Sequence, residues 1–185
     1  MHLRTDFKHL FPGQQANERV YLMFRQHWIV LVSRLAVWFL FLAIYAAVDY
    51  TVSRFFPYSL GENARNLIEL AKLLYLASLA LGLFIIWAMY YLNINIVTNE
   101  RIVDITQKNL LHNTVSELHL NQIEDVTAET KGMFQTFFNY GNVYIQTAGE
   151  TNYFEFTKVP RPTHITKVIL DLYEQLPPEK KQIKP

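Results

Sequence analysis

The chain has 185 residues, of which 51% are hydrophobic and 18% are charged, and its formal net charge is +1. So small a net charge supplies no global field for binding nucleic acid, and the absence of cysteine excludes a disulfide framework and thiolate chemistry. The apolar residues are distributed very unevenly, which indicates that the chain occupies two different environments.

Residues 1–27 are polar with scattered apolar residues, and FPGQQ at 11–15 is a turn signal before ERVYLMFRQHW. We expect this segment to lead directly into a membrane span.

Two long apolar runs follow. WIVLVSRLAVWFLFLAIYAAV starts at Trp28 and contains one charge, Arg34, whereas LLYLASLALGLFIIWAMYYL ends at Leu92 and contains none. Each run can cross a hydrocarbon core of about 30 Å at about 1.5 Å per residue. A buried helix of a soluble protein is the alternative. We predict two antiparallel transmembrane helices, at about 28–50 and 67–92, joined by a short loop.

After the second run, the apolar period changes from helical to two, which indicates β-strands. NINIVTNERIVDITQ predicts a hairpin that turns at Asn99 and Glu100 and whose first strand begins directly at the membrane. Ile123 and Val126 are three residues apart, so we expect a bulge or bend there. Further strands are predicted at 114–120, 124–130, 142–147 and 153–159.

A short helical turn is predicted within GMFQTFFNYG, because its large apolar residues stand at helical spacing. These residues are Met133, Phe134, Phe137 and Phe138. The spacing favours packing on the core, and contact with the membrane or with a partner is the alternative.

RPTHITKVILDLYEQLPP predicts a C-terminal amphipathic helix that begins at the Pro162-Thr163 pair and stops before Pro177. The strands and this helix predict a small α+β or all-β domain at 93–176, followed by a tail at 177–185. An antiparallel sheet of about six to seven strands with one helix over its open end is typical of a pleckstrin-homology (PH)-like fold.

Several motifs occur in a fixed order: FPGQQ and YLMFRQHW before the first span, then VTNERIV, ELHLNQIEDV, FFNYGNVYIQTAG and VPRP. From about residue 11 to residue 176, the chain thereby resembles the bacterial membrane-anchored PH-like domain family, the YdbS-like proteins. The resemblance implies a PH-like fold on the cytoplasmic side of the bacterial inner membrane, a multi-pass protein with both termini in the cytoplasm, and no established activity. Basic residues are nearly balanced across the spans, so the predicted side rests on the resemblance.

Four residues are candidates for tight turns. Gly141 lies between the helical turn and a strand, where a positive φ is often needed, and Asn99 in TNER tolerates the same region. Asn109 in KNLL stands where the family usually shows glycine, and Gly149 ends the FFNYGNVYIQTAG motif.

The chain lacks the motifs of common catalytic and metal sites. Its six histidines include no HExxH motif, and neither GxSxG nor a P-loop occurs. Glu124 and Asp125 are adjacent in a predicted strand, so they point to opposite faces and cannot flank one bond. We therefore expect no enzyme activity, no metal and no cofactor.

Residues 93–176 hold six basic and ten acidic residues, and the first hairpin offers Arg101 alone beside Glu100. Phosphoinositide-type recognition is therefore not expected. We interpret the chain as a non-catalytic, membrane-anchored interaction or scaffold module that assembles with another integral membrane protein or with itself. The alternatives are a component of a transport or pore-forming assembly, although the spans contain no polar line beyond Arg34, and a module that binds a lipid or small ligand.

Overall fold

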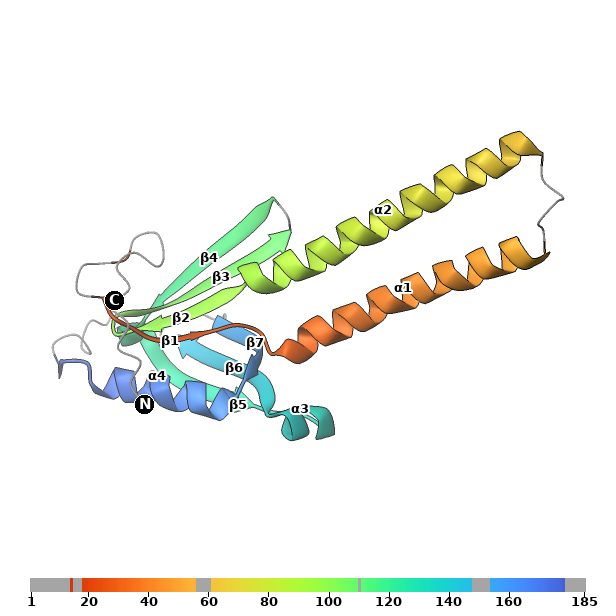
Figure 1. The fold of residues 1–185 in the computed structure, drawn as a ribbon. Helices are drawn as coiled ribbons and strands as arrows, with labels where there is room; N and C mark the ends of the chain where they lie inside the picture. Colours follow the sequence, from red (N-terminus) through yellow and green to blue (C-terminus); the bar gives the residue numbers. More distant parts are fainter. Residues whose placement is uncertain (1–13, 15–17, 56–60, 110, 148–153, 179–185) are drawn as a thin grey trace. The chain divides into compact units, whose positions relative to one another are not determined.

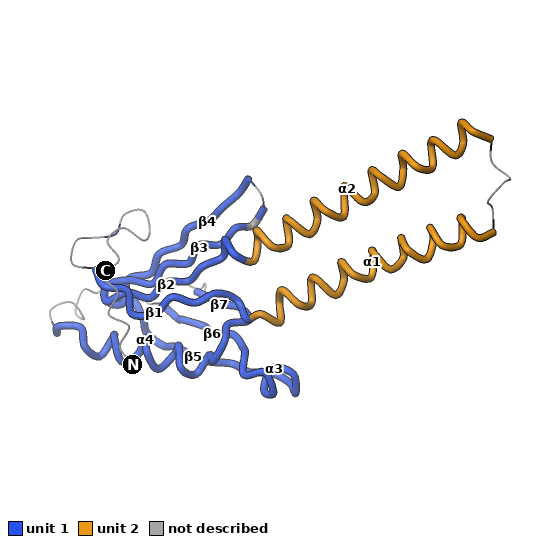
Figure 2. Tube along the Cα trace, in the orientation of Figure 1, with its two compact units in different colours: residues 1–27, 91–185 blue, residues 28–90 orange. Residues whose placement is uncertain are grey.

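The fold is that of a computed structural model, which describes residues 14, 18–55, 61–109, 111–147 and 154–178. The chain divides into two compact units (Figures 1 and 2). Residues 28–90 form the helical unit, and the segments 1–27 and 91–185 on either side of it form the sheet unit. The helical unit is therefore an insertion within the sequence of the sheet unit.

The helical unit consists of α1 (Trp28–Phe55) and α2 (Glu62–Leu92), and both helices are long and apolar enough to cross a membrane. Large apolar side chains along them remain exposed, which is typical of a lipid-facing surface and not of core helices in a soluble protein. Examples are Phe39 (57% exposed), Leu40 (59%), Leu81 (58%) and Phe84 (57%). Helical structure extends past the predicted spans on the side of the connecting loop, as far as Phe55 in α1 and back to Glu62 in α2.

Polar contacts fix an antiparallel register between the two helices. The Trp38 indole N–H donates to the carbonyl oxygen of Leu79 at 2.8 Å, and Lys72 Nζ lies 2.6 Å from Asp49 Oδ1. The two residue numbers of each pair have nearly the same sum, as expected when two helices run antiparallel. Continuing this register brings the first residue of α1 level with the last residues of α2.

The Asp49–Lys72 ion pair also marks one end of the apolar part of the hairpin. About 20 residues separate Trp28 from Asp49 and Lys72 from Leu92, which at about 1.5 Å per residue gives a length of about 30 Å for each helix. This length matches the hydrocarbon core of a bilayer.

The sheet unit contains two antiparallel sheets among its described residues, with strand orders β1-β2-β3-β4 and β5-β6-β7. The strands are β1 (Val20–Phe24), β2 (Ile94–Thr98), β3 (Arg101–Asn109), β4 (His112–His119), β5 (Ile123–Glu129), β6 (Tyr140–Thr147) and β7 (Phe154–Pro160). The predicted fold class is confirmed, and the two sheets do not close into a barrel.

Strand β1 lies in the segment before α1, where the sequence analysis predicts no strand. It pairs antiparallel with β2, from Val20 opposite Thr98 to Phe24 opposite Asn95. Its side chains alternate, because Phe24 is buried in the core while Met23 is 45% exposed. Two segments that lie on opposite sides of the helical hairpin in the sequence thus meet in one sheet.

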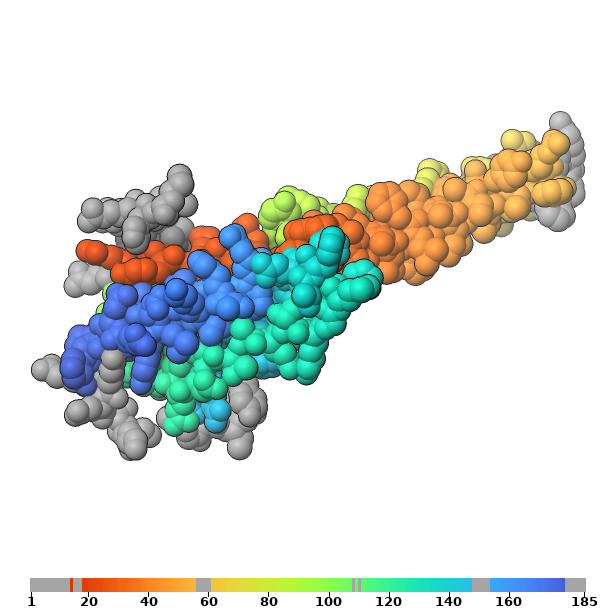
Figure 3. All heavy atoms as spheres, turned by 90° about the horizontal axis from the view of Figure 1, so that it is seen from below, coloured from red at the N-terminus to blue at the C-terminus, as the bar shows by residue number. Residues whose placement is uncertain are grey.

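The C-terminal helix α4 (Pro162–Glu174) begins at Pro162 as predicted and packs against β5 and β6. Ile165, Ile169 and Leu172 lie on its buried face, and α4 forms much of the surface seen in Figure 3. The core beneath it contains Val97, Ile102, Leu118, Leu120, Val143, Ile145, Phe156 and Val159.

The predicted irregularity near Ile123 is confirmed. A 3-10 turn, η1 (Leu120–Gln122), precedes β5, and the register between β5 and β6 shifts between Ile123 and Asp125. The bulge lets both Ile123 and Val126 point into the core.

Candidate functional site

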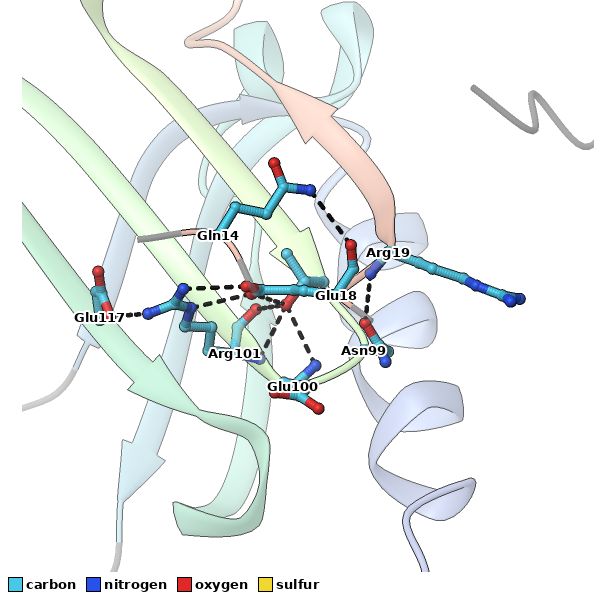
Figure 4. A network of polar contacts seen from close by, with 8 residues as sticks. Gln14, Glu18, Arg19, Asn99, Glu100, Arg101 and Glu117 are labelled. Carbon is cyan, nitrogen blue, oxygen red and sulfur yellow. Dashed lines mark hydrogen bonds and ion pairs between the residues drawn. The ribbon is translucent and has the colours of Figure 1, made fainter. Parts of the chain in front are cut away.

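A network of charged and polar side chains lies where β1, β2 and β3 meet (Figure 4). Arg101, the first residue of β3, donates from Nε to Glu18 Oε1 and from Nη2 to Glu18 Oε2, both at 3.0 Å. Its Nη1 donates to Glu117 Oε2 on β4 at 2.5 Å. The Glu18 side chain is fully buried, and that of Glu117 is partly exposed.

Thr98 completes the network at the end of β2. Its hydroxyl donates to Glu18 Oε1 at 2.9 Å and accepts the backbone N–H of Arg101 at 3.0 Å. The side chain therefore joins the β2–β3 turn to the segment that precedes β1.

Asn99, the next residue of this turn, has a different role from the predicted one. It is not among the residues with positive φ, so the expectation of a left-handed conformation is wrong. Instead Asn99 Oδ1 accepts the backbone N–H of Arg19 at 2.7 Å, and its own N–H donates to the carbonyl of Arg19 at 3.2 Å. Asn99 therefore contributes to this turn through the hydrogen-bond acceptor of its side chain and not through a left-handed backbone conformation.

The network has consequences for the charge of Arg101 and for the stability of the sheet unit. The hydrogen bond with Glu18 is the main cause that raises the pKa of Arg101, burial opposes it, and Glu117 adds to the increase. Arg101 therefore stays charged and cannot transfer protons. Replacing Arg101 with a neutral residue would leave Glu18 as a buried, uncompensated charge, which typically lowers the free energy of unfolding by about 3–5 kcal/mol.

The same pairing bears on lipid recognition at the β2–β3 hairpin. Arg101 is the one basic residue between positions 94 and 107 of this hairpin, and its guanidinium contacts two carboxylates. An anionic headgroup would have to compete with both of them. Across the described part of the chain, no group of three His, Cys, Asp or Glu residues is placed to hold a metal ion.

Gly141 lies inside β6 rather than in a turn, and it is not among the glycines with positive φ. The predicted reason for this glycine is therefore wrong. A Cβ at this position would lie 2.3 Å from the carbonyl oxygen of Glu129 on β5. Glycine is required here because the two backbones approach so closely.

Of the other predicted turn residues, Asn109 is the last residue of β3, opposite His112, and it too is not among the positive-φ residues. Gly149 lies outside the described residues. Positive φ occurs instead at Gly132, Asn139, Lys158 and Arg161.

The predicted helical turn is present as α3 (Met133–Phe138), but its side chains do not pack as the spacing favours. Met133 is 79% exposed, Phe134 66% and Phe137 80%, so the interpretation as core residues is wrong for these three. Phe138 is half-buried and contacts the ring of Phe137 edge-on at 5.0 Å. A short helix with a mostly apolar surface thus projects from the sheet unit.

Contacts at both sides of α3 hold it in place. Gly132, with φ 91°, precedes it, and Asn139 ends it in the left-handed conformation with φ 51°. The next residue, Tyr140, stacks on the His27 ring with centroids 5.1 Å apart. The His27 N–H donates to the carbonyl of Lys158 at 2.7 Å, which ties the last residue before α1 to β7.

Sequence reasoning missed Glu18, whose partner Arg101 is 83 residues away, since no local pattern connects them. A signal for β1 was present, because VYLMF at 20–24 is a short continuous apolar run, which is consistent with a buried strand.

Comparisons with known proteins gave a family match and a structural match. The profile of a family described as bacterial PH domain matches residues 28–173. Among solved structures, the chain is similar to the crystal structure of a DUF1696 family protein with a pleckstrin-homology domain from Shewanella loihica PV-4. The two share 15% sequence identity with a TM-score of 0.37, over 44% of this chain and 70% of that chain. No curated protein matches the chain.

Proposed function

This chain belongs to the bacterial PH domain family, and on that premise we propose that it is a non-catalytic, membrane-anchored interaction module that holds another integral membrane protein at the bilayer surface. Families with PH-like domains are usually non-catalytic, which supports this function. The proposed location is the bacterial inner membrane, with the sheet unit in the cytoplasm.

The way in which the sheet unit is attached supports a partner within the membrane. Three residues separate the end of β1 from the start of α1, and Asn93 alone separates α2 from β2. Two short connections leave the domain little reach. They raise its effective concentration for proteins in the same membrane and keep distant soluble proteins out of range.

The observation that carries the proposal is the edge formed by β4. This strand pairs with β3 on one side and has no hydrogen-bonded strand on the other among the described residues. Its eight residues, HNTVSELH, contain no lysine and no proline, and Glu117, the one acidic residue, is paired with Arg101. Edge strands usually carry lysine or other charged side chains, or proline, which prevent pairing with another chain. Because β4 has neither lysine nor proline, its edge suits the addition of a partner strand.

Crosslinking in intact membranes tests the proposal. The chain has no cysteine, so a photo-crosslinker can be attached to an Asn113→Cys variant on the exposed face of β4. The expected result is a reproducible crosslink to one integral membrane protein or to a second copy of this chain. A Lys167→Cys variant on the exposed face of α4 is the control and should give no such product.

A second substitution shows whether the crosslink depends on the edge of β4. Val115 is 50% exposed, so Val115→Lys should add a protective charge and abolish the crosslink without lowering the thermal stability. Val115→Thr, which adds no charge, should preserve it. A monomer without any reproducible neighbour, together with a small molecule that co-purifies stoichiometrically, would replace the scaffold function by ligand binding.

A further inference from the structure

Helix α3 presents apolar side chains for which the sheet unit provides no cover. Met133, Phe134 and Phe137 are each about two-thirds exposed or more, whereas Phe156 in the core of the same domain is 1% exposed. Surface aromatic residues grouped on one projecting helix are typical of a contact site. What covers them follows from where α3 lies.

Contacts within the sheet unit place α3 beside the point at which the chain leaves for the first span. Tyr140, two residues after α3, stacks on His27, and the residue after His27 is the first of α1. The His27 backbone is fixed in turn by its hydrogen bond to Lys158. His27, the last residue before α1, and α3 therefore lie at the same end of the sheet unit.

The turn between β3 and β4 reaches the same end from the other sheet. Ile105 pairs with Ile94, the first residue of β2, so β3 continues for four residues beyond the start of β2, or about 13 Å. Along this extension the Gln107 N–H donates to Asn93 Oδ1 at 2.6 Å, next to the end of α2. Leu111 in the turn is fully exposed.

Both places at which the chain passes between sheet unit and spans lie on one surface of the bilayer. The register of the helical hairpin brings Trp28 level with the end of α2. Within the sheet unit, the Arg25 guanidinium lies 5.5 Å from the centre of the Tyr91 ring. In Figure 1, α3, the end of β3, the start of β4, the end of β1 and the start of β2 all lie at the same end of the sheet unit.

We propose that α3 and the β3–β4 turn insert their exposed apolar side chains into the interfacial layer of the bilayer that the chain itself spans. Met133, Phe134 and Phe137 form one point of insertion and Leu111 the other. Residues 93–176 carry a formal charge of −4, so the contact is apolar and does not depend on anionic lipid. With two points of insertion and two covalent connections, the domain has one fixed orientation on the membrane.

Lipid quenching tests this in the full chain reconstituted in vesicles of zwitterionic lipid. A fluorescent label is attached to Phe137→Cys or Leu111→Cys, and vesicles with brominated acyl chains are compared with unbrominated ones. Both labels are expected to lose fluorescence to the same degree as a label at Leu92→Cys, the last residue of α2, and the loss should not change with salt. A label at Lys167→Cys should lose none.

A matched variant separates insertion from folding. With the label at Met133→Cys, the double substitution Phe134→Ser and Phe137→Ser should abolish quenching while the melting temperature is unchanged, because neither phenylalanine is buried in the domain. A label that is shielded from water but not quenched by brominated lipid would place α3 in a protein interface and overturn the proposal. Quenching at only one of positions 111 and 137 would also overturn it.

Discussion

Two residues of the sheet unit keep their predicted importance for a different physical reason. Asn99 holds Arg19 through its side-chain oxygen, and Gly141 leaves space for the Glu129 carbonyl of the neighbouring strand. The residue type alone suggests a special backbone angle in both cases. Only the packing of strands that are distant in sequence reveals that a hydrogen bond and a close approach are the actual requirements.

Gly141→Ala should lower the free energy of unfolding by about 1–3 kcal/mol, because the added methyl group forces β6 away from β5. Denaturant unfolding of the full chain in detergent measures this. Gly61→Ala is the control, since a Cβ there meets nothing within 4 Å and the residue does not have positive φ. Equal effects of the two substitutions would show that the close approach is not limiting.

His27 predicts a dependence of stability on pH. Burial lowers the pKa of His27 below its ordinary value of 6.5, so the folded state binds fewer protons than the unfolded state in the window below that value. The stabilising effect of the neutral ring is therefore present above pH 6.5 and is lost as the pH falls below it.

The variant His27→Phe should preserve stacking on Tyr140 and remove this dependence. Melting temperatures of both proteins are compared from about pH 7 to about pH 5. The wild type is expected to lose more stability than the variant as the pH falls, and parallel curves would contradict the role of His27.

At the scale of elements, the apolar pattern predicted most helices and strands but not the neighbours that cover them. Alternation after Leu92 predicted β2 to β7, and the spacing around Ile165 predicted α4, because these patterns are local. In α3 the same kind of spacing was misread, since periodicity shows that a face is apolar without showing what lies against it. The Glu18–Arg101 pair joins residues 83 apart and leaves no local signal.

Strand β1 supplies the prediction at this scale. Phe24→Ala should destabilise the sheet unit by about 3–5 kcal/mol, because the ring is buried and packs edge-on against Phe156 with centroids 5.1 Å apart. The neighbouring substitution Met23→Ala removes a half-exposed side chain and should have a small effect. Denaturant unfolding compares the two. A comparable effect of both would mean that β1 does not contribute to the core.

At the scale of the whole molecule, the sheet unit is assembled from segments on both sides of the hairpin in the sequence. Because β1 pairs with β2, these strands must occupy the same compartment, so in the proposed membrane topology the chain between them crosses the bilayer an even number of times. Strand pairing requires that both strands lie on one side of the membrane but does not determine which side, and the nearly balanced basic residues do not determine it either.

Reporter fusions test the topology. A reporter after Pro185 is expected to be active only in the cytoplasm, and one inserted at Gly61, between α1 and α2, only outside it. Activity of the Pro185 fusion outside the cytoplasm would reverse the proposed orientation, and activity of both fusions in the same compartment would contradict the two spans.

The insertion of the hairpin between β1 and β2 has a consequence for biosynthesis. At a translation rate of about 5–20 residues per second, β1 is made roughly 4–14 s before β2, from which 70 positions separate it. In the proposed two-span topology, the first strand must wait beside the translocation machinery while both spans integrate. If only one of the two helices crosses the membrane, β1 and β2 lie in different compartments. The sheet unit then cannot form, and its unpaired strands become a substrate for proteases. Folding of the domain is thereby a proofreading step for correct integration of the hairpin.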